Sequence, residues 1–483
     1  MIVMKFGGTS VGTGERIANV ARLAARTAQE TGETPVVVVS AMSGVTDSLR
    51  HAARSAASGD RRTFLLIRDE LQQRHEQAIS DCVHDVEHAR GLRAEVAALL
   101  QDFEHLCASI NTLGELTARG LDAVSGLGER LSARIVAAAL RSQGYNSQMV
   151  EATRIIVTNN NFGSAAPILE ETSKRVRDTL PPLLEKGTIP VVTGFIGATI
   201  DGATTTLGRG SSDLTATILG RALPASEVWI WTDVDGVMTA DPRIVPEART
   251  LAQVTYSEVA ELSFFGAKVL HPLAIQPLVE PAIPLRVKNS LNPDHPGTLI
   301  SQNAANGVLI KGITAIRDLS IITVQGHGMQ GVPGIAGRVF TAVAHSGTSV
   351  LMITQSSSEQ NICFLVHTLD APAVVRQVEE ELALELLRGE IDAVVCQDEV
   401  AIVAIVGAGM RGQPGIASQV FGALAEQEIN IISIAQGSSE YNLSLVLAHE
   451  DVNAGVRAIH QQFSLANGRS SKPVRKEARD GAD

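Results

Sequence analysis

An internal repeat constrains the fold of this chain more than any other feature. The pattern G-x-G-M begins at Gly326 and again at Gly407, and the pattern Q-x-S-S-E-x-N begins at Gln355 and again at Gln436. Both patterns recur after the same 81 residues. Matches at one fixed spacing are the signature of a duplicated structural unit, so the chain contains two copies of one module.

Each copy predicts a strand, a glycine loop, a helix, a strand, a serine loop and a strand. The first copy then continues into a helix over 372–387 and a strand over 392–397. The second copy continues into a helix over 452–463 and a polar tail over 467–483, which we expect to be disordered. Its missing last strand is expected at 308–315, before the first copy. The first module would then be inserted into the second.

The first 300 residues alternate apolar runs with helical patterns, which predicts a mostly parallel sheet with helices on both faces. Buried strands are expected within 34–40, 188–197 and 228–236, a loop over 204–213, and a polar linker over 301–307. Residues 60–119 are charged and helical, as in an inserted helical hairpin.

The inserted segment contains four histidines. They are His75, His84, His88 and His105, and His84 and His88 are expected one turn apart on one helix. These histidines lack an accompanying frame of acidic residues, so we interpret them as exposed, solvated side chains rather than metal ligands.

Composition excludes several classes of function. A length of 483 residues suggests two to four domains. The net charge of −12 and the aromatic content of 3% argue against binding to nucleic acids or anionic membranes. The sequence has no signal peptide, no long apolar run and no C-x-x-C pair, so we expect a cytoplasmic protein with free thiols.

The first residues, M-I-V-M-K-F-G-G-T-S-V-G, predict a buried strand, a glycine turn and a helix. Backbone N–H groups at such a turn can face an anion, and Lys5 can supply a cation. Taken alone, the stretch is equally consistent with a tight turn that binds nothing.

Other polar residues follow predicted strands or open predicted helices. Asp213 is either a helix cap or a group that orients a lysine or a phosphate. Glu129 is either an ordinary acid in the first turn of a helix or the partner of a substrate amine. Hydroxyl groups gather in the loop over 40–46, at the strand end where open α/β sheets bind ligands.

Eight motifs occur in the order found in aspartate kinases of the amino acid kinase family, which the chain resembles over residues 2 to 465. They are M-K-F-G-G-T-S-V, V-S-A-M-S-G-V-T, G-E-R-L-S, V-V-T-G-F-I-G, T-L-G-R-G-S-S-D, I-W-T-D-V-D-G-V, A-D-P-R and F-F-G-A-K-V-L-H-P. The repeat resembles the paired ACT domains of those enzymes.

The resemblance implies a fold of class α/β. It consists of an αβα sandwich kinase domain over 1–300 followed by two βαββαβ ACT domains. The first ACT domain would span 317–398, and the second would combine 308–316 with 399–465.

The implied reaction moves the γ-phosphate of ATP to the β-carboxylate of L-aspartate, forming 4-phospho-L-aspartate. This is the entry to lysine, threonine and methionine synthesis.

Lys5 would stabilise charge on the transferring phosphoryl group, and Asp213 would orient the site. Arg209 would hold the α-carboxylate of aspartate and Glu129 its ammonium group. Ser40, Thr46 and Ser212 would complete the aspartate pocket. The residues implied in binding ATP and its phosphates are Lys5, Gly7, Gly8, Thr9, Ser10, Thr232, Asp233, Met238, Arg243 and Lys268.

The implied cofactors are ATP and Mg²⁺, with no metal site built from protein side chains alone. The modules are expected to form a homo-oligomer and to bind an end-product amino acid, with threonine favoured over lysine. The residues implied in effector binding are Met329, Gly331, Gln355, Asn361, Gln436 and Asn442.

Two positions depart from the family pattern. Ser211 replaces the second glycine of R-G-G-S-D, and it would be strained if that position needs a positive φ. Met238 replaces a common tyrosine, which removes a hydroxyl group and an aromatic face from the nucleotide turn.

Three alternatives stay open. The chain could phosphorylate glutamate or uridylate instead, or it could be a non-catalytic amino-acid sensor. It could also be the kinase half of a kinase–dehydrogenase fusion, although no G-x-G-x-x-G unit follows.

Overall fold

The computed structural model describes residues 1–208, 210–267, 269–303, 309–330, 332–355, 360–437 and 440–466. The chain forms two compact units, each described by itself. The first unit contains Met1–Val237, Thr250–Val259 and Lys268–Ala304, and the second contains Met238–Arg249, Ala260–Ala267 and Ala305–Asp483. The segments 238–249 and 260–267, which the resemblance assigned to the kinase domain, therefore group with the second unit.

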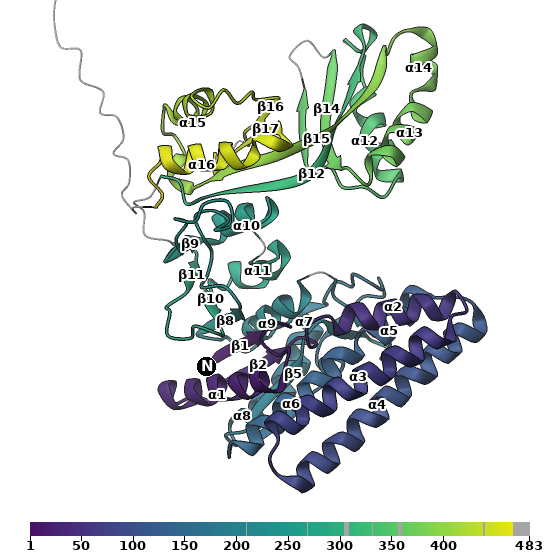
Figure 1. Cartoon of the computed structure of the whole chain (residues 1–483), viewed down its shortest axis with the longest axis vertical. Coiled ribbons are helices and arrows are strands. Elements are labelled where there is room, and N and C mark those ends of the chain that lie inside the picture. The colour runs from purple at the N-terminus through teal and green to yellow at the C-terminus, as the bar shows by residue number, and fades with distance from the viewer. Residues whose placement is uncertain are drawn as a thin grey trace, which may run out of the picture. The chain divides into compact units, whose positions relative to one another are not determined.

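An 8-stranded sheet forms the centre of the first unit, in the order β3-β5-β2-β1-β8-β10-β11-β9 (Figure 1). Every neighbouring pair is parallel except β10 and β11. The strands are β1 (Ile2–Phe6), β2 (Val36–Val39), β3 (Ser147–Val150), β5 (Ile189–Thr193), β8 (Glu227–Thr232), β9 (Gln253–Thr255), β10 (Leu285–Asn289) and β11 (Thr298–Ser301).

Helices cover both faces of this sheet, as the sequence predicts. Met4 and Phe6 of β1 belong to the same buried core as Ile17 of α1 and Leu131 of α6. Lys5 lies between them along the strand and therefore faces the opposite side, where α9 packs against β1 and β2. The helices of the first unit include α1 (Gly14–Thr31), α2 (Val45–Ala57), α5 (Ala118–Ser125), α6 (Leu127–Ser142), α7 (Leu169–Thr179), α8 (Pro181–Leu184), α9 (Ser211–Ala222), α11 (Pro272–Val279) and the short η1 (Ala152–Arg154). Helix α10 (Tyr256–Phe264) begins in the first unit and ends in the second.

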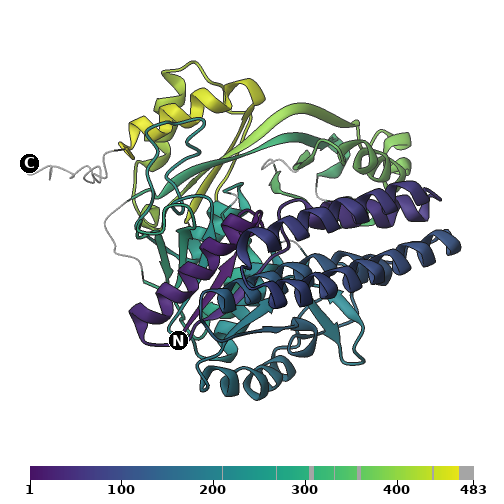
Figure 2. The same cartoon turned by 60° about the horizontal axis from the view of Figure 1, so that its bottom comes forward.

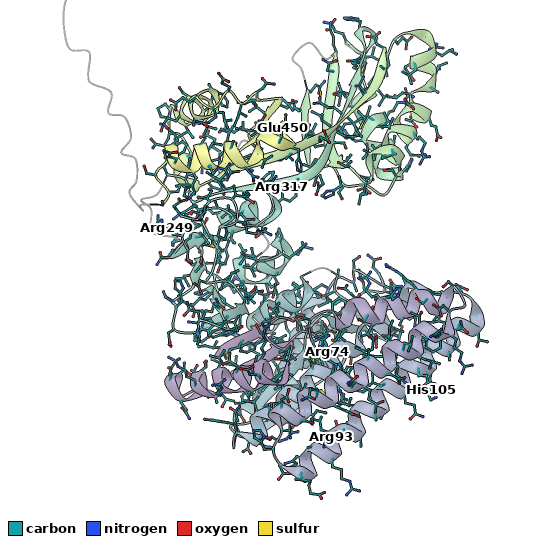
Figure 3. All side chains as sticks on the ribbon, viewed as in Figure 1. Arg74, Arg93, His105, Arg249, Arg317 and Glu450 are labelled. Atoms are coloured by element: carbon teal, nitrogen blue, oxygen red, sulfur yellow. The ribbon has the colours of Figure 1, made fainter. Side chains whose placement is uncertain are left out.

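The predicted helical hairpin is present. It consists of α3 (Arg61–Cys82) and α4 (Val86–Leu113), which run side by side (Figure 2). His105 and His88 are exposed on α4, and Figure 3 labels His105 on this helix. His75, however, is fully buried, because it continues the apolar stripe of α3 that contains Leu71 and Ile79. His84 precedes α4 and does not share its helix with His88. The expectations that His75 is exposed and that His84 and His88 lie on one helix were therefore wrong.

The expected loop over 204–213 is partly ordered structure. Thr204–Thr206 forms β7, which pairs with β6 (Ile196–Thr199), and β6 pairs with β4 (Val157–Thr158) in a second small sheet. Helix α9 begins at Ser211. The expectation missed this strand because the three β-branched residues are next to glycines.

The second unit contains an antiparallel 6-stranded sheet, in the order β13-β14-β12-β15-β17-β16. Two long strands, β12 and β15, each serve both copies of the repeat. The stretch Gly312–Ile316 of β12 pairs with Ile402–Val406 of β15, in the part of the sheet that belongs to the second copy. The strands are β12 (Gly312–Gln325), β13 (Met352–Gln355), β14 (Asn361–His367), β15 (Ala393–Val406), β16 (Ser433–Ala435) and β17 (Asn442–Ala448).

Each copy packs its helices against its part of this sheet. Val339 of the first copy and Val420 of the second occupy corresponding places in two separate cores. The helices are α12 (Ile335–His345), α13 (Ala371–Glu381), α14 (Ala383–Arg388), α15 (Ile416–Ala425), α16 (Val452–Gln462) and the short η2 (His327–Met329), η3 (Ala408–Met410) and η4 (His449–Asp451).

The segment 238–249 is bound firmly to the second copy. The Thr239 hydroxyl lies 3.0 Å from Nε2 of His460, and Nε of Arg249 donates a 2.6 Å hydrogen bond to the carbonyl oxygen of Leu465 (Figure 3 labels Arg249). Ala240 and Val245 enter the core of the second copy. These long-range contacts explain why the segment groups with the second unit.

In the part of the chain that the structure describes, no helix has both the length and the apolar character needed to cross a bilayer. The expected disordered tail over 467–483 lies outside the described residues, as do residues 304–308 of the expected linker and following strand.

Candidate functional site

An ion pair joins β1 to α9, the helix that packs against it. Nζ of Lys5 lies 2.6 Å from Oδ1 of Asp213, and each side chain is only 11% exposed. Lys5 is near the carboxyl end of β1, and Asp213 is in the first turn of α9. The structure thus brings together the two residues predicted to be catalytic, at the sheet edge where α/β proteins bind ligands.

The glycine turn after Lys5 is tightly built. The N–H group of Gly7 donates to the carbonyl oxygen of Trp231, and the N–H group of Ser10 donates to the carbonyl oxygen of Gly7. The hydroxyl groups of Ser10 and Ser290 lie 2.9 Å apart. These bonds occupy two of the N–H groups of the predicted phosphate cradle, which must therefore rely mainly on Gly8 and Thr9.

Helix α9 begins with Gly210 as its N-cap, at φ +68°. A Cβ atom on Gly210 would lie 2.3 Å from the Cβ of His271, so both the dihedral angle and the space require glycine. Ser211 is the first helical residue and does not have a positive φ. The strain considered for Ser211 is therefore absent, because the left-handed position is one residue earlier.

Ser212 is buried against the ends of two strands. A Cβ atom on Gly194 would lie 2.6 Å from the Ser212 hydroxyl, and the N–H group of Gly194 donates to the carbonyl oxygen of Val39 at 2.8 Å. Gly194 thus lets Ser212 approach the same sheet edge as Lys5. Gly194 is the first glycine of the motif V-V-T-G-F-I-G, so the sequence marked this position, although the site prediction omitted it.

Glu129 is a buried carboxylate on α6 with one oxygen engaged. Oε1 accepts a 3.0 Å hydrogen bond from the N–H group of Ala41, whereas Oε2 is buried and has no hydrogen-bond partner among the residues that the structure describes. Burial raises the pKa of the Glu129 carboxyl to about 7, and the Ala41 hydrogen bond opposes this rise. Such a group is suited to receive a ligand's positive charge.

The loop that binds Glu129 also carries the predicted hydroxyl groups. Ser40 directly precedes Ala41, and its carbonyl oxygen accepts a 2.7 Å hydrogen bond from the hydroxyl of Ser132, a residue the site prediction missed. Thr46 lies in the first turn of α2 and is partly exposed. The loop after β2, which contains Ser40 and leads to Thr46 at the start of α2, is therefore bonded to the first turns of α6, where Glu129 lies.

The predicted nucleotide residues are only partly located. Thr232 ends β8, which neighbours β1, and its hydroxyl donates to Asp233 at 3.2 Å. Met238 and Arg243 belong to the second unit, where the Arg243 guanidinium holds the pKa of the Asp241 carboxyl below its usual range. Arg209 and Lys268 lie outside the described residues.

The two ACT copies differ around the predicted effector residues. In the first copy, a cavity of about 330 Å³ is lined by Met329, Gln355 and the start of α12. Asn361 begins β14, beside this cavity's Ile362, and Gly331 lies outside the described residues.

In the second copy, the amide group of Asn442 donates to Oε2 of Glu261, and Oε2 of Glu440 accepts a 2.6 Å hydrogen bond from the N–H group of Gly412. Gln436 is exposed. The structure therefore gives Asn442 an internal partner.

Among the described residues, no three His, Cys, Asp or Glu side chains gather closely enough to hold a metal ion. The site fits a metal ion that arrives bound to the phosphates of a nucleotide. Lys5 and the N–H groups of the glycine turn can bind phosphate oxygens, so the protein need not bind the metal ion with its own side chains.

Comparison with known proteins agrees with this geometry. The amino acid kinase family model matches residues 1–289, and the ACT domain model matches residues 322–382 and 403–463. Aspartokinase 3 of Arabidopsis thaliana is 34% identical over 95% of this chain and 81% of its own length.

A bifunctional aspartokinase/homoserine dehydrogenase of Zea mays is 37% identical over 96% of this chain and 50% of its own length. The chain thus spans about half the length of the bifunctional relatives it matches.

A solved structure of Escherichia coli aspartokinase III in complex with aspartate and ADP has a TM-score of 0.82 and 29% identity. The match covers 96% of this chain and 100% of that chain. Another structure of aspartokinase III, in complex with lysine and aspartate, has a TM-score of 0.79 and 30% identity, over 95% of this chain and 99% of that chain. The kinase fold, the ACT modules and these likenesses together show that the chain belongs to the aspartokinases, a branch of the amino acid kinase family.

Proposed function

We propose that this protein transfers the γ-phosphoryl group of ATP to the β-carboxylate of L-aspartate and forms 4-phospho-L-aspartate. The observation that carries the proposal is the Lys5–Asp213 ion pair beside the glycine turn. A relative that has been solved with aspartate and ADP supports this choice of substrates. The product would be the first intermediate leading to lysine, threonine and methionine.

The chemistry requires charge neutralisation rather than a general base. A carboxylate nucleophile is already ionised at neutral pH, so no side chain has to remove a proton from it. Lys5 would face the developing charge on the phosphoryl oxygens, with Asp213 holding its ammonium group in place. When bound, Mg²⁺ supplies further neutralisation on the ATP phosphates.

Aspartate recognition is proposed to use the loop region around Glu129. Its unpartnered Oε2 would accept the ammonium group of aspartate. Arg209 would bind the α-carboxylate through a forked contact. Ser40, Thr46 and Ser212 would complete the pocket.

Nucleotide binding is proposed to use the glycine turn and the end of β8. Of the turn residues, Gly8 and Thr9 would offer their N–H groups to the phosphates, and Gly7 and Ser10, whose N–H groups are engaged within the protein, would shape the turn. The remaining nucleotide contacts are assigned by the resemblance alone: Thr232, Asp233, Met238, Arg243 and Lys268.

Regulation is proposed to act through the first ACT copy, where Met329 and Gln355 line a cavity large enough for a small amino acid. We propose threonine as the first candidate effector and lysine as the second, and the lysine complex of aspartokinase III supports keeping lysine in the test.

A homo-oligomer formed through the modules is also proposed. Ile353 on β13 and Ile434 on β16 occupy corresponding positions in the two copies and are 51% and 43% exposed. The cytoplasmic location stays a prediction.

A coupled assay of ADP release with a panel of acceptors tests the proposal. We expect release with L-aspartate and far less with glutamate or uridylate, and inhibition by threonine or lysine. Activity on a different acceptor would replace aspartate in the proposal. Loss of all activity while threonine or lysine still binds would favour the non-catalytic sensor.

A further inference from the structure

A buried carboxylate outside the predicted site joins three segments of the first unit. Asp122, on α5, is 2% exposed. Its Oδ1 accepts a 2.7 Å hydrogen bond from the Thr206 hydroxyl, and its Oδ2 accepts 2.9 Å hydrogen bonds from the N–H groups of Thr206 and Gly163. Both oxygens are thus engaged by neutral donors.

Such a group is costly to bury. An ionised carboxylate loses its hydration inside a protein and is tolerated only when hydrogen bonds replace the lost water. Three donors converge on Asp122, two of them backbone N–H groups whose positions are set by the chain itself. The arrangement therefore fixes the backbone at Thr206 and Gly163 relative to α5.

The two elements held by Asp122 lead directly to the proposed aspartate pocket. Thr206 ends β7, from which the chain passes through Gly208 to α9 and its residues Ser212 and Asp213. On the other side, the N–H group of Gly126 donates to the carbonyl oxygen of Asp122 at 3.0 Å, where α5 turns into α6 and Glu129.

We propose that Asp122 is a positioning residue for aspartate, because it holds the segment that carries Glu129 against the segment that leads to Ser212 at the start of α9. This inference rests on the proposed function. Asp122 itself lies among protein donors, so it acts on the substrate only through these two segments.

The substitution Asp122→Asn tests this role with almost no change in volume. An amide replaces one carboxylate oxygen with an N–H₂ group, so the Thr206 hydroxyl can keep its contact only by accepting instead of donating, and the two N–H groups then bond to a neutral oxygen rather than to a charged one. A displacement of about 1 Å at a reacting group can cost about a hundredfold in rate. We expect the KM for aspartate to rise at least about tenfold, and the KM for ATP to change less than about twofold.

Companion variants separate positioning from general damage. Thr206→Val removes one donor and should raise the KM for aspartate by a smaller factor, whereas Thr206→Ser keeps the hydroxyl group and should behave like the wild type. Asp201→Asn, in the exposed turn between β6 and β7, makes the same change of charge and should have no effect. If Asp122→Asn does not fold, the two Thr206 variants still decide the question.

The outcomes also separate this inference from the proposed function. If Glu129→Gln and Arg209→Ala raise the KM for aspartate but Asp122→Asn and Thr206→Val do not, the positioning role is wrong and the pocket stands. Equal changes in the KM for aspartate and for ATP would also overturn the positioning role. If Glu129→Gln and Arg209→Ala leave the KM for aspartate unchanged, the pocket assignment itself fails.

Discussion

At the scale of single residues, we propose that the Lys5–Asp213 ion pair combines a structural and a catalytic role. We predict that Lys5→Met lowers turnover at least about a hundredfold, because a well-placed cationic donor contributes about 3–4 kcal/mol to phosphoryl transfer. The same variant should melt at a lower temperature, because it leaves Asp213 buried without its partner.

The double variant Lys5→Met/Asp213→Asn separates the two roles. It removes the uncompensated charge, so its melting temperature should recover while its turnover stays low. Near-normal turnover in Lys5→Met would refute the catalytic role of Lys5.

Glu129 predicts a pH dependence of aspartate binding. With a pKa of about 7, its carboxyl is mostly protonated at pH 6 and mostly ionised at pH 8. Only the ionised form attracts an ammonium group. The KM for aspartate should therefore fall about tenfold as the pH rises from 6 to 8. Glu129→Gln should give a high KM that stays constant over this range, and a constant KM in the wild type would contradict the assignment.

How much of the site could be predicted differed from residue to residue. Lys5 and Asp213 were found because each sits in a motif beside a turn. Asp122 could not be found, because its partners Thr206 and Gly163 are brought to it only by the fold. Whether Ser211 is strained could not be decided from sequence, because sequence does not show which residue of a glycine turn adopts the left-handed conformation; in the structure it is Gly210.

At the scale of elements, the α3–α4 hairpin contains a buried titratable group. Burial lowers the pKa of His75 from 6.5 to about 4, and its Nδ1 lies 2.6 Å from the carbonyl oxygen of Leu71. Above pH 6.5 the ring is neutral in both the folded and the unfolded chain. Between pH 6.5 and 4, only the unfolded chain takes up the proton, so the free energy of unfolding decreases as the pH falls.

We predict that His75→Leu reduces the acid sensitivity of the fold. The full effect is roughly 3 kcal/mol, and it develops between pH 6.5 and 4. Melting temperatures measured at pH 7.5 and pH 5 should diverge less in His75→Leu than in the wild type. His105→Leu, at an exposed position on α4, is the matched control and should follow the wild type. Identical pH dependence in all three proteins would contradict the prediction.

The elements themselves were largely predictable, with one instructive failure. Continuous apolar runs gave the central strands, and charged periodic stretches gave the hairpin. The strand β7 was missed because neighbouring glycines favoured a loop, although Thr204–Thr206 is a β-branched run typical of strands. The burial of His75 was readable from its spacing to Leu71 and Ile79.

At the scale of the whole molecule, the duplication has produced two copies that are not equivalent. The 81-residue spacing predicted two copies of one module, but not that β12 and β15 would join the copies in one sheet. Nothing in the sequence predicted that 238–249 and 260–267 pack on the ACT unit, because those contacts join residues far apart in the chain.

This inequivalence predicts different effects for corresponding substitutions. Gln355→Ala, which removes an exposed side chain that lines the cavity of the first copy, should raise the effector concentration for half-maximal inhibition roughly three- to tenfold, as expected for the loss of one hydrogen bond to the bound effector. Gln436→Ala should have a smaller effect, because the second copy uses Asn442 to bind Glu261. Dose–response curves with threonine and lysine measure both, and a larger effect of Gln436→Ala would reverse the assignment.

The central claim is that this chain makes an acyl phosphate from aspartate. The most direct measurement incubates the protein with ATP, Mg²⁺, L-aspartate and hydroxylamine, which converts an acyl phosphate into a stable hydroxamate. The account predicts aspartyl hydroxamate in proportion to ADP released, and none above background from Lys5→Met. ADP release without hydroxamate, or no reaction with aspartate at all, would contradict it.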